Sequence, residues 1–195
     1  MRAFAITGGV ACGKSTVLKL FAEQGATIYS ADEDARAARA EPEVQARILE
    51  ALGTTDPKEL AAKIYADPGA RKALNGIVHP EVRKRTRTRI DAAHNSDEDG
   101  FILYEVPLLF EGSLETWFDG TIAVVASPDV QRARLRERHP DATEADLDAR
   151  LSAQMAPEEK AKRADYAIRT DVPLEETRSE VERVYGFLWH PEPLG

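Results

Sequence analysis

Residues 8–15 read Gly-Gly-Val-Ala-Cys-Gly-Lys-Ser and match the pattern G-x-x-x-x-G-K-[ST] without a mismatch. The octet follows an apolar run, Ala3–Thr7, and leads into a segment from Lys14 that carries apolar residues at helical spacing. In such a strand–turn–helix unit the glycines let backbone N–H groups point inward around a phosphate, and the helix N-terminus adds partial positive charge. The sequence therefore predicts a loop that binds a nucleoside triphosphate.

The residue types of this loop predict how the triphosphate is held. Lys14 is expected to bridge the β- and γ-phosphates, and the Ser15 hydroxyl is expected to ligate Mg²⁺. Glu105, at the end of a later apolar run, is placed to hold Mg²⁺ through water; a solvent-exposed acid at a strand end is the alternative. The candidate nucleotide-binding residues are Gly8, Gly9, Val10, Ala11, Cys12, Gly13, Lys14, Ser15 and Thr16.

Cys12 is the only cysteine, so the chain can form no internal disulfide and no cysteine-based zinc site. It lies near Lys14 and a helix N-terminus, and both conditions lower the pKa of a thiol. We therefore expect alkylation of Cys12 to inhibit the protein and bound Mg-nucleotide to protect it. A small, buried and unreactive side chain is the alternative.

The composition is ordinary for a globular protein and indicates one catalytic core with small inserted lobes in 195 residues. The 26 Lys and Arg against 34 Asp and Glu give a net charge of −8, which argues against non-specific nucleic-acid binding but leaves local basic patches open. Apolar stretches such as Phe101–Pro107 are too short to span a bilayer, and no leader segment is evident. We expect a cytoplasmic protein without a membrane partner, either a monomer or a weak homo-oligomer.

Five short apolar runs are near-continuous and β-branched or aromatic, which is typical of strands buried on both faces of a parallel sheet. They alternate with amphipathic helical segments, and this order predicts a three-layer α/β core. The expected strands are 3–7, 26–30, 101–106, 121–126 and 166–169, and the expected helices include 14–24, 33–39, 43–52 and 174–189, the last capped by Thr170 or Asp171.

Two helical insertions, at about 57–95 and about 129–165, interrupt this alternation after strand ends. Open α/β sheets bind ligands at the carboxyl ends of their strands. We therefore expect an acceptor-side lobe and a lid on a single domain, whose core comprises 1–56, 96–128 and 166–195. The alternative is that both insertions are extra packing helices.

Three classes of nucleotide-binding protein fit such a loop. A GTP-binding switch protein is disfavoured because no Asn-Lys-x-Asp motif follows a strand, and a motor or transporter ATPase needs a longer core. A small-molecule kinase needs a base near the γ-phosphate, cations for the developing charge and a lid that excludes water. Asp32, just past the second strand, is the candidate base; capping of the next helix is its alternative role.

The arginine-dense segment Gln131–Arg138 supplies the candidate cations. Residues four apart stack on one face of a helix, so one pair of arginines can point into the site while another pair is solvated. The pairs are Arg134 with Arg138 and Arg132 with Arg136, and the same spacing makes Arg150 and Gln154 candidates to reach the nucleotide from the second lid helix.

Motifs along nearly the whole chain resemble those of the dephospho-coenzyme A kinase family. Beside the phosphate loop through Thr16, the most specific are Val106-Pro-Leu-Leu-Phe-Glu111 and the upstream His79-Pro80. The others, in family order and spacing, are Ala31-Asp32 followed by Ala35-Arg36, Gln131-x-x-Arg134-x-x-x-Arg138, Arg150-Leu-x-x-Gln154 and Ala164-Asp-Tyr-x-Ile168. The resemblance implies a P-loop kinase fold, with a parallel sheet in the order 2-3-1-4-5, a helical substrate domain and a lid.

The resemblance also implies the activity, which is transfer of the γ-phosphoryl of ATP, with Mg²⁺, to the ribose 3′-hydroxyl of dephospho-coenzyme A. That reaction is the last step of coenzyme A synthesis. Asp32 is then the catalytic base, Lys14, Arg134 and Arg138 stabilise the transferring charge, and Arg150 contacts ATP. The implied acceptor-binding residues are Thr7, Asp32, His79, Arg83, Pro107, Leu108, Leu109, Phe110 and Glu111.

Chemistry supports these acceptor residues, and each also has a simpler explanation. Leu108–Phe110 can cover an adenine, or they can be plain core. The basic run from Arg83 to Arg89 can neutralise a diphosphate. His79 can line the acceptor site or serve only as a packing or capping residue.

The chain departs from the family pattern at two places. Ser30 stands where many members carry Asp, so Asp32 is the only carboxylate there. Arg169-Thr-Asp171 replaces an Asn-rich ending after the last strand, which leaves the adenine contacts of ATP open. A nucleoside monophosphate kinase or a shikimate-type kinase is the closest alternative function, and a GTP-binding switch is the non-enzyme alternative.

Overall fold

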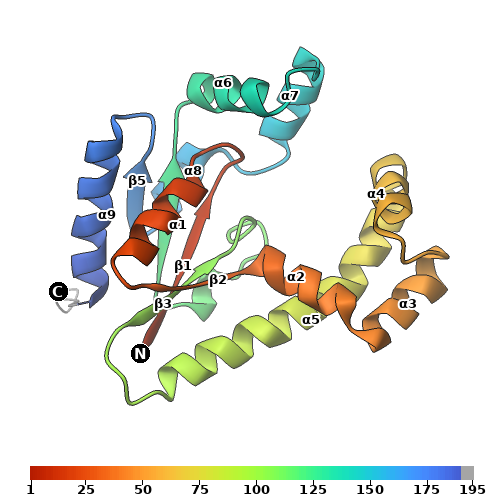
Figure 1. Cartoon of the computed structure of the whole chain (residues 1–195), viewed down its shortest axis with the longest axis horizontal. Coiled ribbons are helices and arrows are strands. Elements are labelled where there is room, and N and C mark those ends of the chain that lie inside the picture. The colour runs from red at the N-terminus through yellow and green to blue at the C-terminus, as the bar shows by residue number, and fades with distance from the viewer. Residues whose placement is uncertain (190–195) are drawn as a thin grey trace. The chain divides into compact units, whose positions relative to one another are not determined.

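The computed structural model describes residues 1–189; residues 190–195, assigned above to the core, lie outside the described part of the chain (Figure 1). Strands and helices alternate as the sequence predicts. The strands are β1 (Arg2–Gly8), β2 (Thr27–Ser30), β3 (Phe101–Glu105), β4 (Gly120–Val125) and β5 (Tyr166–Arg169). The helices are α1 (Lys14–Glu23), α2 (Ala31–Ala40), α3 (Pro42–Leu52), α4 (Pro57–Ala66), α5 (Pro68–His94), the 3-10 helix η1 (Glu115–Trp117), α6 (Pro128–Arg138), α7 (Glu144–Ser152), α8 (Pro157–Arg163) and α9 (Leu174–Trp189).

The strands form one parallel sheet in the order β2-β3-β1-β4-β5, which confirms the predicted topology. β1 lies at the centre, where Ile6 is paired in register with Glu105 of β3 and with Ile122 of β4. The carboxyl ends of the central strands therefore meet at one edge of the sheet. The phosphate loop leaves β1 at this edge, and the segment from Val106 leaves β3 beside it.

Helices α1 and α9 pack on one face of the sheet and form the main hydrophobic core with it (Figure 1). Because side chains of a strand alternate between faces, Phe4 and Ile6 both point to this side. Helix α9 contributes a fully buried stripe of Val181, Val184 and Leu188 at helical spacing. This stripe places the last helix against the sheet, as the apolar periodicity predicts.

The predicted capping of α9 by Thr170 or Asp171 is wrong. Helix α9 begins at Leu174, and both side chains bind elsewhere. The Thr170 hydroxyl donates to the carbonyl oxygen of Cys12, and the Asp171 carboxylate accepts the backbone N–H of Ser127. The segment after β5 is thus tied to the phosphate loop and to the start of α6.

Helix α8 contacts β4 and β1. The β1 side chains that alternate with Phe4 and Ile6 belong to the second face of the sheet, and one of them, Thr7, is fully buried. Lys160 of α8 is also fully buried, and its Nζ lies 3.4 Å from Oγ1 of Thr7. The central strand is therefore covered on this side by a helix that carries a buried cation.

Contacts divide the chain into two compact units, one comprising Met1–Tyr29 with the chain from Ala92 onward, and the other Ser30–Asp91. The second unit has its own apolar core, to which α3, α4 and α5 contribute Val44, Ile48, Leu52, Leu60, Ala70, Leu74 and Val78. Residues 30–56, expected in the sheet-bearing core, thus belong to the helical unit. The spacing of four along α3 predicts its buried stripe but not the helices that cover it.

The second unit is also held by a buried ion pair between Asp34 and Arg89. Asp34 is 1% exposed; its Oδ2 accepts a hydrogen bond of 2.9 Å from Arg89, and its Oδ1 lies 2.8 Å from the second terminal nitrogen of the same guanidinium. Burial raises the pKa of Asp34, although the charges of Arg89 and Arg85 act to lower it.

We expect Asp34→Ala to lower the free energy of unfolding by about 3 kcal/mol, because it removes the buried carboxylate that pairs with the Arg89 guanidinium. This is the low end for a buried pair, since the Arg89 side chain stays 31% exposed. The matched variant Glu33→Ala, at an exposed position of the same helix turn, should change stability by less than about 0.5 kcal/mol. Urea denaturation measures both, and equal stabilities would contradict the prediction.

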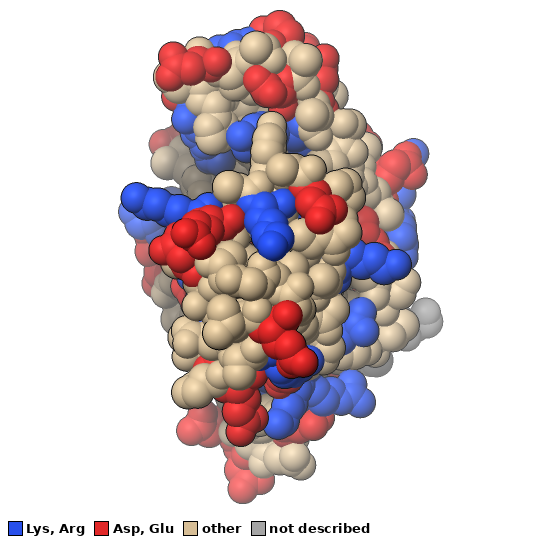
Figure 2. Space-filling model, turned by 90° about the vertical axis from the view of Figure 1, so that its right-hand side faces the viewer, with Lys and Arg blue, Asp and Glu red and all other residues tan. Residues whose placement is uncertain are grey.

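In the view of Figure 2, basic and acidic side chains are interspersed over the surface and do not gather into a field of one sign. None of the described helices is long and apolar enough to cross a membrane.

Candidate active site

The phosphate loop joins β1 to α1 and depends on two glycines. Gly13, at the N-cap of α1, has a left-handed φ of 79°, and a Cβ there would lie 2.9 Å from Oγ1 of Thr170. A Cβ at Gly8 would lie 2.6 Å from the carbonyl oxygen of Val124. Position 13 requires a glycine because of both its left-handed φ and its contact with Thr170. Position 8 requires a glycine because its backbone lies so close to β4 that a Cβ would not fit.

Hydrogen bonds hold the loop in shape. The backbone N–H of Cys12 donates to the carbonyl oxygen of Gly9 at 3.3 Å. Lys14 Nζ donates to the carbonyl oxygen of Gly8 at 3.2 Å, so the ammonium lies across the loop. From outside, Oγ1 of Thr170 donates to the carbonyl oxygen of Cys12 at 2.7 Å. The loop is thus supported from both of its ends and from Thr170, the residue that follows β5.

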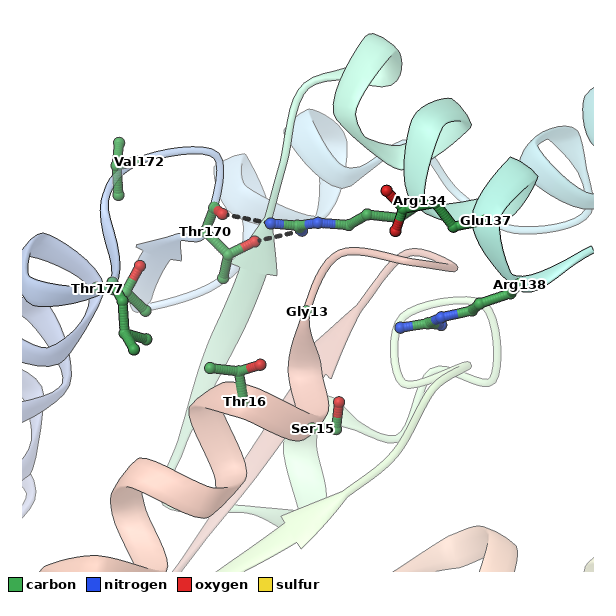
Figure 3. Close-up of a pocket in the computed structure, with 10 residues that line it drawn as sticks. Gly13, Ser15, Thr16, Arg134, Glu137, Arg138, Thr170, Val172 and Thr177 are labelled. Atoms are coloured by element: carbon green, nitrogen blue, oxygen red, sulfur yellow. Dashed lines mark hydrogen bonds between the residues drawn. The ribbon is translucent and has the colours of Figure 1, made fainter.

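A pocket of about 320 Å³ opens beside the start of α1 (Figure 3). Its walls come from α1, α6, the segment after β5 and α9. The lining residues are Gly13, Ser15, Thr16, Arg134, Glu137, Arg138, Thr170, Val172, Leu174 and Thr177. Since the N-terminus of α1 presents its positive end here, the pocket suits an anionic ligand.

Two arginines of α6 line this pocket, but they are engaged differently. Arg134 donates to Oγ1 of Thr170 at 3.0 Å and to the carbonyl oxygen of Thr170 at 2.6 Å (Figure 3). It also donates to the carbonyl oxygen of Ala11 at 3.3 Å. Within the described residues, Arg138 makes no hydrogen bond or ion pair. Its guanidinium donors are therefore available to a phosphate.

The opposite face of α6 is occupied by contacts to α7. Arg132 and Arg136 both pair with Glu144. Because residues four apart share one face of a helix, Arg134 and Arg138 line the pocket whereas the other two arginines pair with α7, as the sequence indicates. Arg150 is exposed on α7 and is not part of the pocket wall, so the structure does not bring it to the other candidates. Oε1 of Gln154 is buried and has no hydrogen-bond partner among the described residues.

The segment Pro107–Glu111 follows β3 and is largely packed. Leu109 and Phe110 are 0% and 3% exposed, whereas Leu108 is 45% exposed. Of the three apolar residues expected to cover an adenine, only Leu108 therefore offers exposed surface. The carbonyl oxygen of Pro107 accepts a hydrogen bond of 3.1 Å from Oγ1 of Thr7, which brings these two candidates together.

Lys160 is a residue of this region that sequence reasoning missed. Its fully buried Nζ donates to the carbonyl oxygen of Pro107 at 2.6 Å and lies 3.0 Å from Glu111. The sequence Pro-Glu-Glu-Lys-Ala-Lys-Arg of α8 resembles an exposed, charged helix. The only available signal was the position of Lys160 one helical turn after the apolar Pro157, on the side of α8 that is buried.

Asp32, the candidate base, belongs to the second unit. It is exposed in the first turn of α2, and Ser30 occupies the N-cap position. The alternative that Asp32 caps this helix is therefore wrong. An exposed carboxylate just after a strand end remains free to meet a ligand.

His79 and Arg83, one turn apart on α5, also belong to the second unit. Partial burial lowers the pKa of His79, and the nearby charge of Arg83 lowers it further, so the imidazole ring is neutral near pH 7. Arg83 makes no ion pair within the described residues, whereas Arg85 and Arg89 of the same basic run are both paired. The run therefore offers fewer unpaired cations to a diphosphate than its composition suggests.

The residues present fit a magnesium ion that arrives with a nucleotide. The Ser15 hydroxyl lines the pocket and makes no hydrogen bond within the part of the chain described. Among those residues no three His, Cys, Asp or Glu side chains gather as a metal site. Mg²⁺ usually takes one or two protein oxygens and fills its shell with water and phosphate oxygens. Glu105, at the end of β3, offers a second oxygen ligand at the same sheet edge.

The expectation of a thiol with lowered pKa at Cys12 is wrong. The side chain is 1% exposed, and its burial raises the pKa of the thiol. Backbone hydrogen bonds and the charge of Lys14 act in the opposite direction but are outweighed. Cys12 is therefore a small buried side chain, as the alternative interpretation held.

This combination of sheet order, phosphate loop and a helix, α6, that brings arginines to the pocket defines a P-loop kinase. The family model CoaE, described as dephospho-CoA kinase, matches residues 2–176. The chain belongs to the dephospho-CoA kinase family.

Individual relatives agree with this assignment. A dephospho-CoA kinase of Anaeromyxobacter dehalogenans is 38% identical over 96% of this chain and 92% of its own length. The crystal structure of TT1252 from Thermus thermophilus superposes with a TM-score of 0.77 at 31% identity, covering 96% of this chain and 97% of that one. A dephospho-CoA kinase from Campylobacter jejuni, at 24% identity and a TM-score of 0.68 over 96% and 97% of the chains, shares the fold.

Proposed function

We propose that the chain transfers the γ-phosphoryl of ATP to the ribose 3′-hydroxyl of dephospho-coenzyme A, giving coenzyme A and ADP. The observation that carries this proposal is the match to the dephospho-CoA kinase family from residue 2 to residue 176. That span includes the phosphate loop, the arginines of α6 and the segment Pro107–Glu111.

The nucleotide half of the site rests on charge and backbone geometry. The backbone of residues 8–13 and the positive end of α1 hold the phosphates, and Lys14 exchanges its bond to Gly8 for the β- and γ-phosphates. Arg138, with its donors unengaged, reaches the γ-phosphate. Arg134 keeps the loop bound to Thr170 and adds positive charge beside it. The proposed role of Arg150 as an ATP contact rests on the family motif alone.

Mg²⁺, when bound with the nucleotide, would neutralise phosphate charge and polarise the transferring group. The Ser15 hydroxyl would be its protein ligand, with Glu105 acting through water. ATP would thereby be bound as its magnesium complex.

On the acceptor side, Asp32 is proposed to orient the 3′-hydroxyl and to take its proton. The hydroxyl oxygen then forms a bond to the γ-phosphorus while the bond to the bridging oxygen of ADP breaks. Arg83 is proposed to face the diphosphate and Leu108 the adenine. The other proposed acceptor-binding residues are Thr7, His79, Pro107, Leu109, Phe110 and Glu111, of which Leu109 and Phe110 act by packing.

The test compares ADP release from Mg-ATP with dephospho-coenzyme A, AMP, CMP and shikimate as acceptors. We expect dephospho-coenzyme A to exceed the others by at least about a hundredfold in kcat/KM, because only its full set of contacts positions the reacting hydroxyl. Coenzyme A, whose 3′-position already carries the phosphate, is the matched control and should give no release above ATP alone. Faster release with AMP, CMP or shikimate would overturn the proposal. Tight GTP preference with slow turnover and no acceptor would indicate a switch protein.

We also propose a cytoplasmic protein that is a monomer or weak homo-oligomer and binds no nucleic acid. The absence of nucleic-acid binding rests on the net charge of −8, and the cytoplasmic location rests on the single cysteine, which suits a reducing compartment.

A further inference from the structure

Lys160 places a cation in the interior of the sheet-bearing unit. Its side chain is 0% exposed, although the neighbouring Lys162 on the same helix is 71% exposed. An ammonium buried in protein is costly unless its donors are satisfied and its charge is compensated. The three N–H donors of Lys160 have acceptors in Pro107, Glu111 and Thr7. Because all three donors have acceptors, the Lys160 ammonium holds these acceptor groups in place.

The acceptors of Lys160 belong to two segments that leave neighbouring strands. Thr7 is the penultimate residue of β1, immediately before the phosphate loop. Pro107 and Glu111 lie in the segment after β3, and the carbonyl oxygen of Pro107 also accepts a hydrogen bond from Thr7. Lys160 therefore connects the carboxyl end of β1, which leads into the phosphate loop, to the segment 107–111 that follows β3.

Other residues of α8 contact the same two segments. Pro157 packs against the phosphate loop so closely that a Cβ on Gly9 would lie 3.0 Å from its Cγ. Arg163 lies over the ring of Phe110, 4.6 Å from the ring centre, and pairs with Glu115 of η1. Helix α8 is thus fixed to both segments, with Lys160 between its two ends.

Glu111 is the charged partner within this arrangement. Its partial burial alone would raise the carboxyl pKa, but the N–H of Met155, the hydrogen bond from Lys160 and the Lys160 charge outweigh that effect and lower the pKa. The Lys160 Nζ lies 3.0 Å from one carboxylate oxygen and 3.3 Å from the other. The carboxylate is therefore held from two sides by α8 and the residues before it.

We propose that Lys160 is a positioning residue that sets the segment 107–111 in a fixed place relative to the phosphate loop, so that the acceptor meets the γ-phosphate in reactive geometry. The inference rests on the proposed function, because it takes this segment as part of the acceptor site. Lys160 has no exposed surface with which to touch a substrate, so it acts through Pro107 and Glu111.

The experiment compares Lys160→Met with Lys162→Met, which makes the same change at an exposed site two residues along the same helix. We expect Lys160→Met to raise the KM for dephospho-coenzyme A at least about tenfold, because a displacement near 1 Å suffices for effects of that size. Its KM for ATP should stay within about threefold of wild type, since the phosphate loop keeps its own contacts. Lys162→Met should leave both constants unchanged.

Hydrogen exchange provides a readout that needs no substrate. The amides of Gly112, Ser113 and Leu114 donate to the carbonyl oxygens of Leu108, Phe110 and Leu109. In Lys160→Met we expect these amides to lose protection while the amide of Cys12 keeps its protection. Lys160→Gln, which keeps a neutral donor, serves as a second variant if the methionine variant does not fold, and it should show the same pattern to a smaller extent.

Four outcomes decide between these alternatives. Selective loss of protection at residues 112–114 together with a selective rise in the acceptor KM supports the proposal. Constants and exchange equal to those of Lys162→Met, or a uniform loss of protection and stability with both KM values unchanged in the folded fraction, would overturn it. If the wild type does not phosphorylate dephospho-coenzyme A, the proposed function fails, and the exchange comparison still shows whether Lys160 holds the segment.

Discussion

Asp32→Asn is expected to lower kcat by at least about a hundredfold while leaving the affinity for ATP nearly unchanged, since a positioned general base contributes on this scale. Asparagine keeps the size of the side chain but cannot accept the proton of the attacking hydroxyl. Asp32 is exposed in the first turn of α2 and has no capping role there, so the substitution removes chemistry and little structure. Steady-state kinetics with saturating dephospho-coenzyme A, together with ATP binding measured by calorimetry, tests this.

Glu33→Gln is the matched control for Asp32→Asn. Both substitutions remove one negative charge from the first turn of α2, so both lose the same small interaction with the helix dipole. Only Asp32 is proposed to touch the acceptor. Turnover of Asp32→Asn within a few-fold of Glu33→Gln would remove Asp32 from the chemistry.

Lys14→Met is expected to lower kcat/KM by about a hundredfold to a thousandfold, as when one preorganised charge or donor is removed from a transition state. The Lys14 ammonium already lies across the loop, on the carbonyl oxygen of Gly8, so a bound triphosphate requires only a short movement of it. Methionine has nearly the same length and cannot replace the charge. Because Gly8 and Gly13 fix the loop through their own packing, its backbone should persist in the variant.

The control for this variant is Lys19→Met, five residues further along α1 at an exposed position. It removes the same charge from the same helix without touching the loop. Kinetics and the melting temperature of both variants should be measured side by side. Equal activities would show that Lys14 takes no part in the transfer, and a lower melting temperature for Lys14→Met alone would point to a structural role.

The parts of the site that depend on backbone chemistry could be predicted from the sequence. Gly13 adopts a left-handed φ that other residues rarely adopt, so the requirement is visible as a glycine at a fixed spacing from Lys14. The five near-continuous apolar runs likewise correspond to strands. Burial on both faces holds for the central strands β1, β3 and β4, but the prediction is wrong for the edge strands, since β2 has no buried residue and β5 only Ile168. The loop glycine and the strands both depend on the conformation of residues that are close together in the sequence. The order of the strands in the sheet was instead predicted from the family resemblance.

The parts that depend on distant partners could not be predicted. The apolar stripe of α3 is evident in Val44, Ile48 and Leu52, but nothing local indicates whether a sheet or another helix covers it. Arg134 was expected in the pocket, yet its bonds to Thr170 join residues 36 positions apart. Lys160 was not among the predicted site residues, because burial of a lysine becomes visible only once its acceptors are assembled around it.

The burial of the Cys12 thiol determines how the protein responds to oxidants. Peroxides and electrophiles attack thiolates, and they need to reach the sulfur. A side chain 1% exposed, with its pKa raised by burial, offers neither the anion nor the access. Nucleotide binding by the phosphate loop should therefore persist in the presence of oxidants, even without a reducing agent. A loss of activity in stored or oxidant-treated protein would then originate at another residue.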